Sequence, residues 1–565
     1  MTGIREFDIE VRGMTCDHCE RTVAKALAAV PGVVKVEAVS HKHASARISA
    51  TGDASAARIE RAVAKAGYTA RVRVEQPAPT GPTVVAGSSD LAGPRVGDAH
   101  DYDLLIVGGG SAGFSAAIKG AELGFRVAMA EGGTLGGTCV NVGCVPSKTL
   151  IRAAEAQHRR VHHGFDGIAV TDGRPDWPTV RAAKDALVTE LRDAKYWGVL
   201  RSYEAITLIE QRAEFTGGRA VRLADGTTIT ARKIVVTTGA SAWAPPIPGL
   251  AAAGYLDNVT AMALEKLPAS MLVIGASAVG LELAQMFCRL GVQITVLEAA
   301  PRVVPAEDPD VGDALGDYLR AEGLTVHAGV KIVSVARSDG HYRVSFKDGE
   351  TVRHGDAEQL LVATGRRANT AGFGLEAAGV KLGRRGEIVV NAFLQTANPD
   401  IYAAGDVIGD PMFVYVAAYG GALAAENALI GNARKYDLSV VPKVTFTDPG
   451  VASVGFTADQ ARQAGIEPLV SKLPLEHVPR SLAARDTRGF VQLVADAATR
   501  KIIGGHVLAA EAGEMITEVA LAIRFGLTIE DLTSMFHPYL TLSEGIKLAA
   551  QTFDKDVSKL SCCAT

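Results

Sequence analysis

Three pairs of cysteines are the residues of this chain best suited to chemistry: Cys16/Cys19, Cys139/Cys144 and Cys562/Cys563. The members of the last pair are adjacent, and neighbouring Cα atoms lie about 3.8 Å apart, which is shorter than the roughly 4.4–6.8 Å usual for a disulfide. Closely spaced thiols of this kind bind a soft metal ion or exchange electrons. The sequence therefore predicts metal or redox chemistry, positioned by the elements around these pairs.

The overall composition indicates a multidomain protein that acts on a small partner. The chain has 565 residues, 48% of them hydrophobic, and its 58 basic and 62 acidic residues give a net charge of −4. This balance offers no basic surface for nucleic acid or an anionic membrane. The N-terminal MTGIREFDIEVRGM lacks the apolar stretch of a secretory signal, and no apolar run is long enough to span a bilayer. We therefore expect a cytoplasmic protein whose thiols stay reduced.

The first pair of cysteines lies in a small N-terminal region. Alternating apolar residues predict strands and apolar residues at helical spacing predict two helices, in the βαββαβ order of a ferredoxin-like domain over residues 1–75. Cys16 and Cys19 fall on one face at the start of the first helix, where the helix dipole favours thiolates. Their GMTCDHC motif resembles that of heavy-metal-associated domains, with a thioredoxin-like redox role as the alternative. Residues 76–100, rich in Pro, Gly and Ser, predict a flexible linker.

Two glycine-rich motifs predict two dinucleotide sites in a doubly wound, largely parallel α/β region. Each motif stands between a strand-like and a helix-like segment, and an acidic residue suited to a ribose hydroxyl ends the next strand. The first set is Gly108, Gly110, Gly113 and Glu131, and the second is Gly275, Gly280 and Glu298. Ser277 replaces the usual middle glycine of the second motif. Two such sites in one chain indicate electron transfer between two cofactors.

The second pair of cysteines lies between the two motifs, in GGTCVNVGCVPSK. This segment strongly resembles the redox-active disulfide of the flavoprotein pyridine nucleotide-disulfide oxidoreductases, and the resemblance extends from about Asp101 to the C-terminal region. It implies that FAD is bound by the first glycine motif and by further residues: Glu131, Thr138, Lys148, Ala213, Asp406 and Val414. It also implies that Glu282 pairs with Lys148 near the flavin and that Cys144 is a thiolate. A purely structural role for the two cysteines is the alternative.

The same resemblance divides the rest of the chain into segments and implies a homodimer. Residues 101–250 and 369–441 would form the FAD-binding domain, residues 251–368 the NAD(P)H-binding domain, and residues 442–565 an α+β dimerisation domain with a Cys-Cys tail. In this family each active site is completed by residues of the partner subunit. The implied fold class is α/β, with two Rossmann-like domains and a dimerisation domain that follow the small ferredoxin-like domain.

The C-terminal sequence favours a metal ion over a disulfide as the substrate. Disulfide-reducing members of the family carry an H-P-x-x-x-E type signature near the C-terminus. Its histidine, five positions before the glutamate, protonates the leaving thiol. Here FHPYLTLSEG places Tyr539 at that position relative to Glu544, and His537 stands earlier. Tyrosine, with an unperturbed pKa of about 10, is a poor proton shuttle at neutral pH, whereas a metal ion needs no proton on reduction.

Resemblance to the Hg(II)-reducing members of the family implies a route for the metal through the three thiol pairs. The N-terminal pair would collect Hg(II) as a thiol complex, and the C-terminal pair of the partner subunit would receive it. The Cys139/Cys144 pair would hold it while two electrons from NAD(P)H, passed through FAD, give Hg(0). Tyr196 and Tyr539 would line this final site; an ordinary half-buried helical position is the alternative for Tyr196.

The sequence leaves two questions open: which nicotinamide cofactor is the reductant, and which of three functions the protein has. Glu298 disfavours the 2′-phosphate of NADPH and suits the ribose hydroxyl of NADH, whereas Arg302 offers that phosphate a partner, and the Hg(II)-reducing members generally use NADPH. Cys288 is expected to be a packed core thiol. The alternative functions are a dihydrolipoamide dehydrogenase-like disulfide reductase with a fused metal-binding domain, and a metal-buffering thiol protein.

Overall fold

The chain forms two compact units, Met1–Ala92 and Gly93–Thr565. The computed structural model describes residues 5–13, 17–41, 45–50, 56–73, 100–171 and 173–557. Most of the linker predicted over residues 76–100 therefore lies outside the described residues. Within the described ranges, no helix combines the length and the apolar character needed to cross a lipid bilayer.

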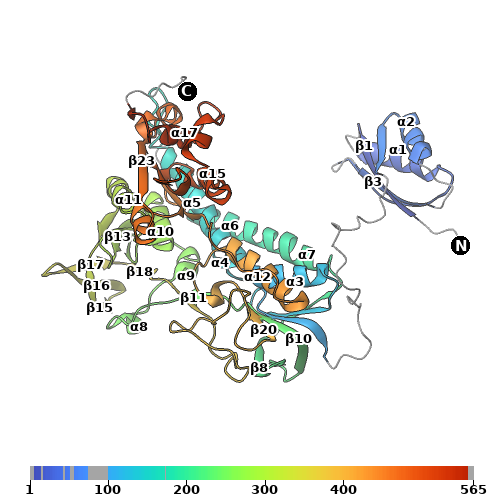
Figure 1. Ribbon diagram of the computed structural model, residues 1–565, viewed down its shortest axis with the longest axis horizontal. Helices are drawn as coiled ribbons and strands as arrows, with labels where there is room; N and C mark the ends of the chain where they lie inside the picture. Colours follow the sequence, from blue (N-terminus) through green and yellow to red (C-terminus); the bar gives the residue numbers. More distant parts are fainter. Residues whose placement is uncertain are drawn as a thin grey trace. The chain divides into compact units, whose positions relative to one another are not determined.

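The smaller unit is a four-stranded antiparallel sheet with two helices (Figure 1). Its elements follow the predicted order: β1 (Arg5–Arg12), α1 (Asp17–Ala28), β2 (Val33–Ser40), β3 (Ser45–Ala50), α2 (Ala56–Lys65) and β4 (Thr69–Arg73). Alternate residues of β1, Ile9 and Val11, are buried together with Val23 and Leu27 of α1. The strand and helix periodicities of the sequence thus meet in one core, and the predicted βαββαβ fold is confirmed.

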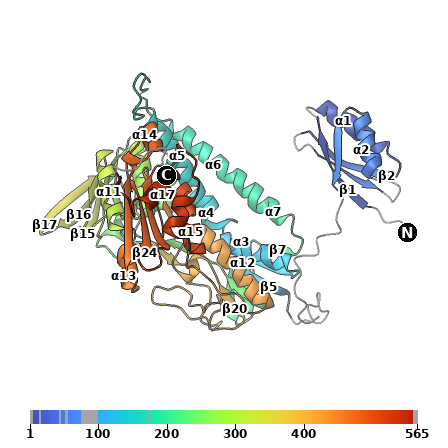
Figure 2. The same ribbon diagram turned by 45° about the horizontal axis from the view of Figure 1, so that its top comes forward.

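The larger unit begins with a mostly parallel sheet that carries the first glycine motif. The strand order is β7-β6-β5-β10-β9-β8, with β20 also paired to β10. The bounds are β5 (Tyr102–Val107), β6 (Val127–Ala130), β7 (Ile206–Ile209), β8 (Ala213–Gly217), β9 (Ala220–Leu223), β10 (Thr228–Val236) and β20 (Ile401–Ala403). Helices α3 (Ser111–Glu122) and α12 (Val414–Ile430) lie side by side in both ribbon views (Figures 1 and 2). The continuous buried apolar runs in β5 (LLIV) and β6 (VAMA) fit a parallel sheet that is covered on both faces.

A second parallel sheet, in the order β14-β13-β12-β18, carries the second glycine motif. Its strands are β12 (Ser270–Ile274), β13 (Gln293–Leu297), β14 (Thr325–His327) and β18 (Gln359–Val362), and its helices are α10 (Ala278–Arg289) and α11 (Pro309–Ala321). An antiparallel sheet of β15 (Lys331–Ser338), β16 (His341–Asp348) and β17 (Thr351–Ala357) adjoins it. Strands β11 (Ala240–Ala242) and β19 (Arg366–Ala368) pair with each other.

The last sheet is antiparallel, in the order β21-β22-β25-β24-β23. Its strands are β21 (Lys443–Thr445), β22 (Gly450–Gly455), β23 (Pro468–Pro474), β24 (Phe490–Asp496) and β25 (Ile502–Ala509). The helices of this region are α13 (Ala458–Gln463), α14 (Pro479–Ala484), α15 (Ala512–Phe525), α16 (Ile529–Ser534) and α17 (Glu544–Gln551). The change from alternating strands and helices to an α+β pattern beyond Pro442 is therefore confirmed.

A run of helices lies between β6 and β7 in the chain. They are α4 (Gly137–Val142), α5 (Cys144–Arg159), α6 (Trp177–Arg192), a π-helical turn (Asp193–Trp197) and α7 (Gly198–Leu200); short helices α8 (Leu250–Ala253) and α9 (Asn258–Met262) come later. One hydrophobic core joins Leu150 of α5, Phe287 of α10 and Leu508 of β25. The segment with the second cysteine pair is thus packed directly against the second parallel sheet and the last antiparallel sheet.

Candidate active site

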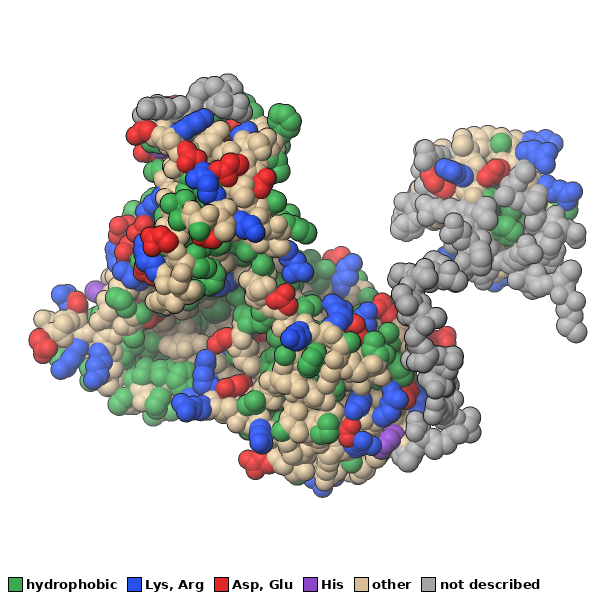
Figure 3. Space-filling view, in the orientation of Figure 1, with side chains coloured by type: hydrophobic (Ala, Val, Ile, Leu, Met, Phe, Trp, Pro, Cys, Tyr) green, Lys and Arg blue, Asp and Glu red, His purple; other side chains and the backbone are tan. Residues whose placement is uncertain are grey.

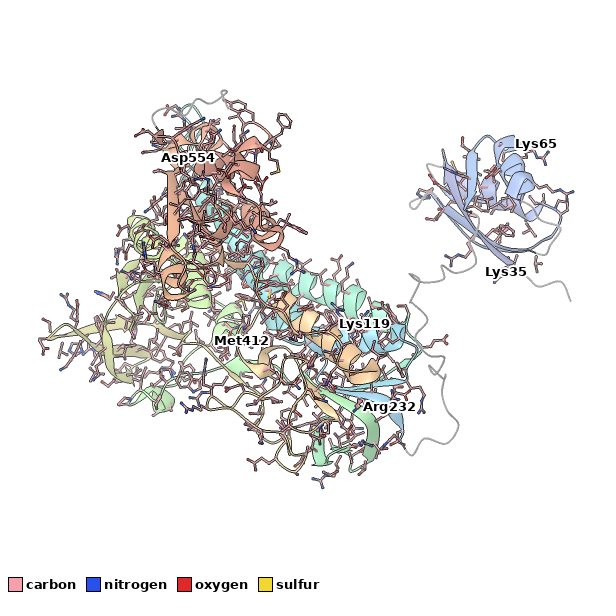
Figure 4. The ribbon with its side chains drawn as sticks, in the orientation of Figure 1. Lys35, Lys65, Lys119, Arg232, Met412 and Asp554 are labelled. Carbon is pink, nitrogen blue, oxygen red and sulfur yellow. The ribbon has the colours of Figure 1, made fainter. Side chains whose placement is uncertain are left out.

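A cavity of about 880 Å³ brings most of the predicted site residues of the larger unit together. This volume lies in the range of ligand-binding pockets. The predicted residues that line it are Gly108, Gly110, Glu131, Thr138, Cys139, Cys144, Lys148, Ala213, Glu282, Asp406 and Val414. Met412, labelled in Figure 4, lines it from the segment that precedes α12. The glycine motif and the N-terminus of α3 form part of the wall, which fits a dinucleotide with its pyrophosphate at that helix end.

The two central cysteines lie on successive helices that a single glycine separates. Cys139 is in α4 and Cys144 opens α5, with Gly143 between them. A Cβ on Gly143 would lie 2.9 Å from the carbonyl oxygen of Thr138 and 3.3 Å from the Cα of Cys139, so a side chain would not fit. Pro146 falls in the first turn of α5, where the missing N–H costs no hydrogen bond. The GCVPSK sequence therefore turns the chain sharply and starts a helix at a thiol.

The surroundings of the pair favour ionisation of one thiol over the other. The Cys139 thiol donates a hydrogen bond to Cys144, and this bond, together with the nearby Lys148 charge, lowers the pKa of Cys144 to about 7. The same bond, together with burial, raises the pKa of Cys139 above its ordinary range. The start of α5 adds a helix dipole that favours an anion. Of the two thiols, Cys144 is therefore the one that ionises more readily, which is consistent with the thiolate role that the family resemblance implies.

A partly buried ion pair stands one helical turn beyond Cys144. The Nζ of Lys148 lies 2.7 Å from Glu282 Oε2, so the predicted pair of these two residues is confirmed. Phe446 completes the arrangement, because its N–H donates to Glu282 Oε1 at 2.9 Å and its ring centroid lies 4.6 Å from Lys148 Nζ. Phe446 also lines the cavity. The sequence gives no local signal for this role, since Phe446 stands in KVTFTDP, which reads only as a strand.

The reactivity of Cys144 is expected to rise with pH around neutrality. Its pKa of about 7 means that the thiolate persists above this pH and is lost below it. Alkylation of the reduced protein by iodoacetamide, followed by mass spectrometry of the Cys144 peptide, should show this midpoint. Lys148→Met removes the nearby positive charge and should raise the midpoint by roughly one pH unit. A wild-type midpoint at the value of about 8.5 of an unperturbed thiol would contradict the prediction.

Both glycine motifs pack in the same way. A Cβ on Gly113 or Gly280 would lie 1.9 or 2.0 Å from the carbonyl oxygen of the first glycine of its own motif, Gly108 or Gly275. Neither position therefore admits a side chain. Ser277, by contrast, has the extended backbone (φ −87°, ψ −175°) that its counterpart in the first motif also adopts. The conformation at this position does not require glycine, which explains why a serine is accommodated.

The acidic residues that follow the two motifs are also equivalent. Each carboxylate accepts two backbone N–H groups, one from its glycine motif and one from the loop beyond, at 2.6 Å for Glu131 and at 2.6 and 2.7 Å for Glu298. Carboxylate oxygens accept several hydrogen bonds, so capacity for a ribose hydroxyl remains. Arg302, the alternative partner for a 2′-phosphate, pairs with Asp313 at 3.1 Å.

The remaining predicted flavin contacts come from later parts of the chain. Ala213, at the start of β8, is buried, and Val414 opens α12. Asp406 lies after β20, 3.8 Å from the Nε of Arg366, and burial raises the pKa of its carboxyl group. Parallel pairing of β20 with β10 brings this segment beside the first sheet. The two segments predicted to bind FAD therefore line one cavity.

The two predicted tyrosines have different surroundings. Tyr196 is half-buried in the π-helical turn, with its ring centroid 4.8 Å from that of Phe114. Burial raises the pKa of its hydroxyl, which is hydrogen-bonded to Ser111. Tyr539 is 52% exposed in the loop before α17. His537, two positions earlier, is held by Glu518 at 2.5 Å, and this bond raises the pKa of the imidazole.

The other thiols divide between the described and the undescribed parts of the chain. Cys19 lies in α1 and is partly exposed, whereas Cys16, Cys562 and Cys563 lie outside the described residues. Cys288 packs against the core that backs α10, as predicted, and burial raises the pKa of its thiol to about 11. It does not share the ionised state of Cys144.

Comparison with known families identifies the class of protein. Residues 102–421 match the pyridine nucleotide-disulphide oxidoreductases, residues 441–550 match their dimerisation domain, and residues 8–69 match the heavy-metal-associated domain. The chain belongs to the pyridine nucleotide-disulphide oxidoreductase family, and the predicted fold class is confirmed. Membership implies FAD and NAD(P)H as cofactors.

Individual proteins and solved structures that resemble the chain are more specific than the family match. The chain is 42% identical to a mercuric reductase from Staphylococcus aureus, over 99% of both chains, and 42% identical to one from Acidithiobacillus ferrooxidans, over 100% of both. Among solved structures, the flavoprotein disulfide reductase RclA from Escherichia coli has a TM-score of 0.72 at 30% identity, over 80% of this chain and 99% of that chain. LpdA from Mycobacterium tuberculosis has a TM-score of 0.71 at 29% identity, over 80% and 100%.

Proposed function

We propose that this protein reduces Hg(II) to Hg(0) at the Cys139/Cys144 pair with electrons from NAD(P)H. Full-length similarity to mercuric reductases supports the proposal. The observation that carries it is the thiol pair itself, in which Cys144 has a pKa of about 7 beside a cofactor-sized cavity. Thiolates are the preferred ligands of soft ions such as Hg(II). NAD(P)H and a mercuric bis-thiolate would give NAD(P)⁺, a proton, Hg(0) and two thiolates, which balances the two electrons.

The residues of the chain would bind the metal and orient the cofactors. Cys139 and Cys144 would hold Hg(II) between them, and Lys148 would keep Cys144 ionised. A bound flavin would supply the two-electron transfer from the nicotinamide. The N-terminal and C-terminal thiol pairs would deliver Hg(II) as a thiol complex, because each exchange replaces one mercury–thiolate bond with another and releases no ion into water. Tyr196 and Tyr539 are the proposed side chains around the final site.

The active unit would be a homodimer in which the tail of one subunit serves the site of the other. The dimerisation-domain match supports this arrangement. Large apolar side chains are also exposed in the same region, including Phe525 at 72% and Phe536 at 96%. Figure 3 shows hydrophobic side chains at the surface of this part of the larger unit. Exposed apolar side chains that gather in one region are typical of a protein–protein interface.

NADPH is the expected reductant, with appreciable use of NADH. Glu298 would face the ribose, and a carboxylate there would repel a 2′-phosphate but accept a 2′-hydroxyl. Arg302, already paired with Asp313, is left as the counter-charge for the phosphate. Steady-state kinetics with both donors should therefore give kcat/KM values within about a hundredfold of each other, which corresponds to less than about 2.8 kcal/mol. A larger preference for NADPH would show that Glu298 does not exclude the phosphate.

The function is tested by measuring the product directly. Purified, FAD-loaded protein is given NADPH and Hg(II) bound to a small thiol, and NADPH oxidation and mercury vapour are followed together. We expect one Hg(0) for each NADPH oxidised. A dihydrolipoamide dehydrogenase-like enzyme would instead turn over lipoamide without releasing vapour, and a metal-buffering protein would do neither. Absence of mercury vapour from active flavoprotein would exclude the proposal.

A further inference from the structure

One face of α10 is polar although it is buried. Glu282, Gln285 and Arg289 recur at helical spacing. The first two residues are only 5% and 3% exposed, and the side chain of Arg289 is 3% exposed. They face the loop between β21 and β22, at residues 446–449. A buried polar group is costly unless it is paired, so a face of this kind has to be matched by its neighbour. Each of these three side chains has a polar partner in the loop.

Gln285 forms a reciprocal pair with the backbone of Asp448. Its Oε1 accepts the N–H of Asp448 at 2.8 Å, and its Nε2 donates to the carbonyl oxygen of Asp448 at 2.8 Å. One turn nearer the N-terminus, Glu282 accepts the N–H of Phe446 at 2.9 Å. The backbone of the loop is therefore bonded to α10 at two levels, which fixes the helix against both sliding and rotation.

The C-terminal end of α10 is fixed by charge. Arg289 lies between two carboxylates, with Nε 2.5 Å from Glu322 and Nη1 2.9 Å from Asp448. The other carboxylate oxygen of Asp448 lies 2.8 Å from Arg488, which pairs in turn with Asp486. Breaking one member of a buried network of this kind leaves an uncompensated charge, so such networks are rigid.

The opposite end of the same helix reaches the active-site cavity. Ala278, Val279, Glu282 and Leu283 line that cavity, and Glu282 also holds Lys148 beside Cys144. Because a helix of this length behaves as a rigid rod, a displacement at Gln285 or Arg289 moves these residues as well. A shift of about 1 Å is enough to slow a reaction that depends on close approach.

We propose that Gln285, Arg289 and Asp448 are positioning residues for the reduction of the flavin by NAD(P)H. They act through α10, by setting where its N-terminal residues stand relative to the redox helix. The inference rests on the cofactors of the proposed function but not on the identity of the metal. It assigns to the β21–β22 loop of the dimerisation region a role in receiving the nicotinamide.

Gln285→Met tests this role, because methionine keeps the length and volume of the side chain and removes its three hydrogen bonds, two with the backbone of Asp448 and one to Glu322 Oε2. Calorimetry of the oxidised holoenzyme should show NADP⁺ bound about three- to tenfold more weakly, the effect of one or two lost hydrogen bonds. Stopped-flow reduction of the flavin by NADPH should slow by a similar or larger factor. Oxidation of the two-electron-reduced enzyme by thiol-bound Hg(II) should slow by a smaller factor, since Cys139 and Cys144 stand on α4 and α5 and α10 reaches them only through the Glu282–Lys148 pair.

Gln492→Met is the matched control. Gln492 is also 3% exposed, and its side chain joins the dimerisation region to α11 instead of α10, through a 3.0 Å bond to the N-cap residue Asp308. Its loss should lower thermal stability without changing NADP⁺ affinity or either half-reaction. Asp448→Asn, which keeps the shape of the side chain and removes its charge, serves as a second variant should Gln285→Met fail to fold.

Three outcomes overturn the inference. The first is unchanged NADP⁺ affinity and flavin reduction in the folded variants, and the second is an equal loss of rate in both half-reactions. The third is that Gln492→Met also weakens NADP⁺ binding and slows flavin reduction more than reoxidation by Hg(II). Failure of the proposed function is recognised separately. In that case reduced wild-type enzyme would not be reoxidised by Hg(II), while NADP⁺ binding and flavin reduction would still respond to Gln285→Met.

Discussion

Cys144→Ser is expected to lower Hg(II)-dependent NADPH oxidation by at least about a thousandfold, because residues that act as one catalytic unit cannot replace each other. The variant loses the thiolate that the Cys139 hydrogen bond and Lys148 sustain. A serine hydroxyl is neither ionised near neutral pH nor a ligand for a soft metal. Turnover is measured as NADPH oxidation and mercury vapour, at saturating thiol-bound Hg(II). Reduction of the flavin by NADPH in a single turnover should persist.

Cys288→Ser is the matched control for this experiment. Cys288 is partly buried, its pKa is raised to about 11, and it packs against the core without lining the cavity. We expect near wild-type turnover from this variant. Substantial mercury reduction by Cys144→Ser, or an equal loss in Cys288→Ser, would show that the central pair is not the site of the reaction.

Replacing both Cys562 and Cys563 with alanine is expected to lower turnover of thiol-bound Hg(II) by about a hundredfold or more. The central pair then has to take the metal directly from a bulky complex, without an exchange partner that the chain itself holds at high effective concentration. Single-turnover reduction of the flavin by NADPH should not change, which separates delivery from electron transfer. Comparison of the two rates in one preparation provides the measurement.

The corresponding double variant of Cys16 and Cys19 is the control for the tail. This pair lies in a separate unit, and a small thiol in excess can present Hg(II) in its place. When such a thiol is present, replacing Cys16 and Cys19 should therefore lower the turnover of Hg(II) far less than replacing Cys562 and Cys563. An undiminished rate in the tail variant would mean that Hg(II) reaches Cys139 and Cys144 by another route.

Sequence predicts best those parts of the site that depend on neighbouring residues. GGTCVNVGCVPSK contains the two thiols, the glycine that turns the chain between them and the lysine of the ion pair, and all of these line one cavity. The two glycine motifs are equally local, and their packing follows from the absence of a Cβ at Gly113 and Gly280. The ferredoxin-like unit was predictable because its apolar periodicities switch cleanly between strand and helix.

Other features of the site could be recognised only in the folded structure. Phe446 contacts Glu282 across 164 positions of sequence, and no local pattern marks that contact. The polar face of α10 reads in the sequence as an interruption of an apolar helix, and only the facing loop shows that each of its groups is paired. The π-helical turn at Tyr196 has no sequence signature either. These features depend on how distant segments pack, which propensity does not encode.

The single core that joins Leu150, Phe287 and Leu508 has a consequence for how cofactors are received. Because this core backs the part of the cavity wall that α5 and α10 form, that part of the wall is shaped before a cofactor enters. Association then loses little protein conformational entropy, which is the condition for tight retention. A substitution in β25, distant in sequence from every residue that touches the flavin, should accordingly loosen its hold as well as weaken the fold.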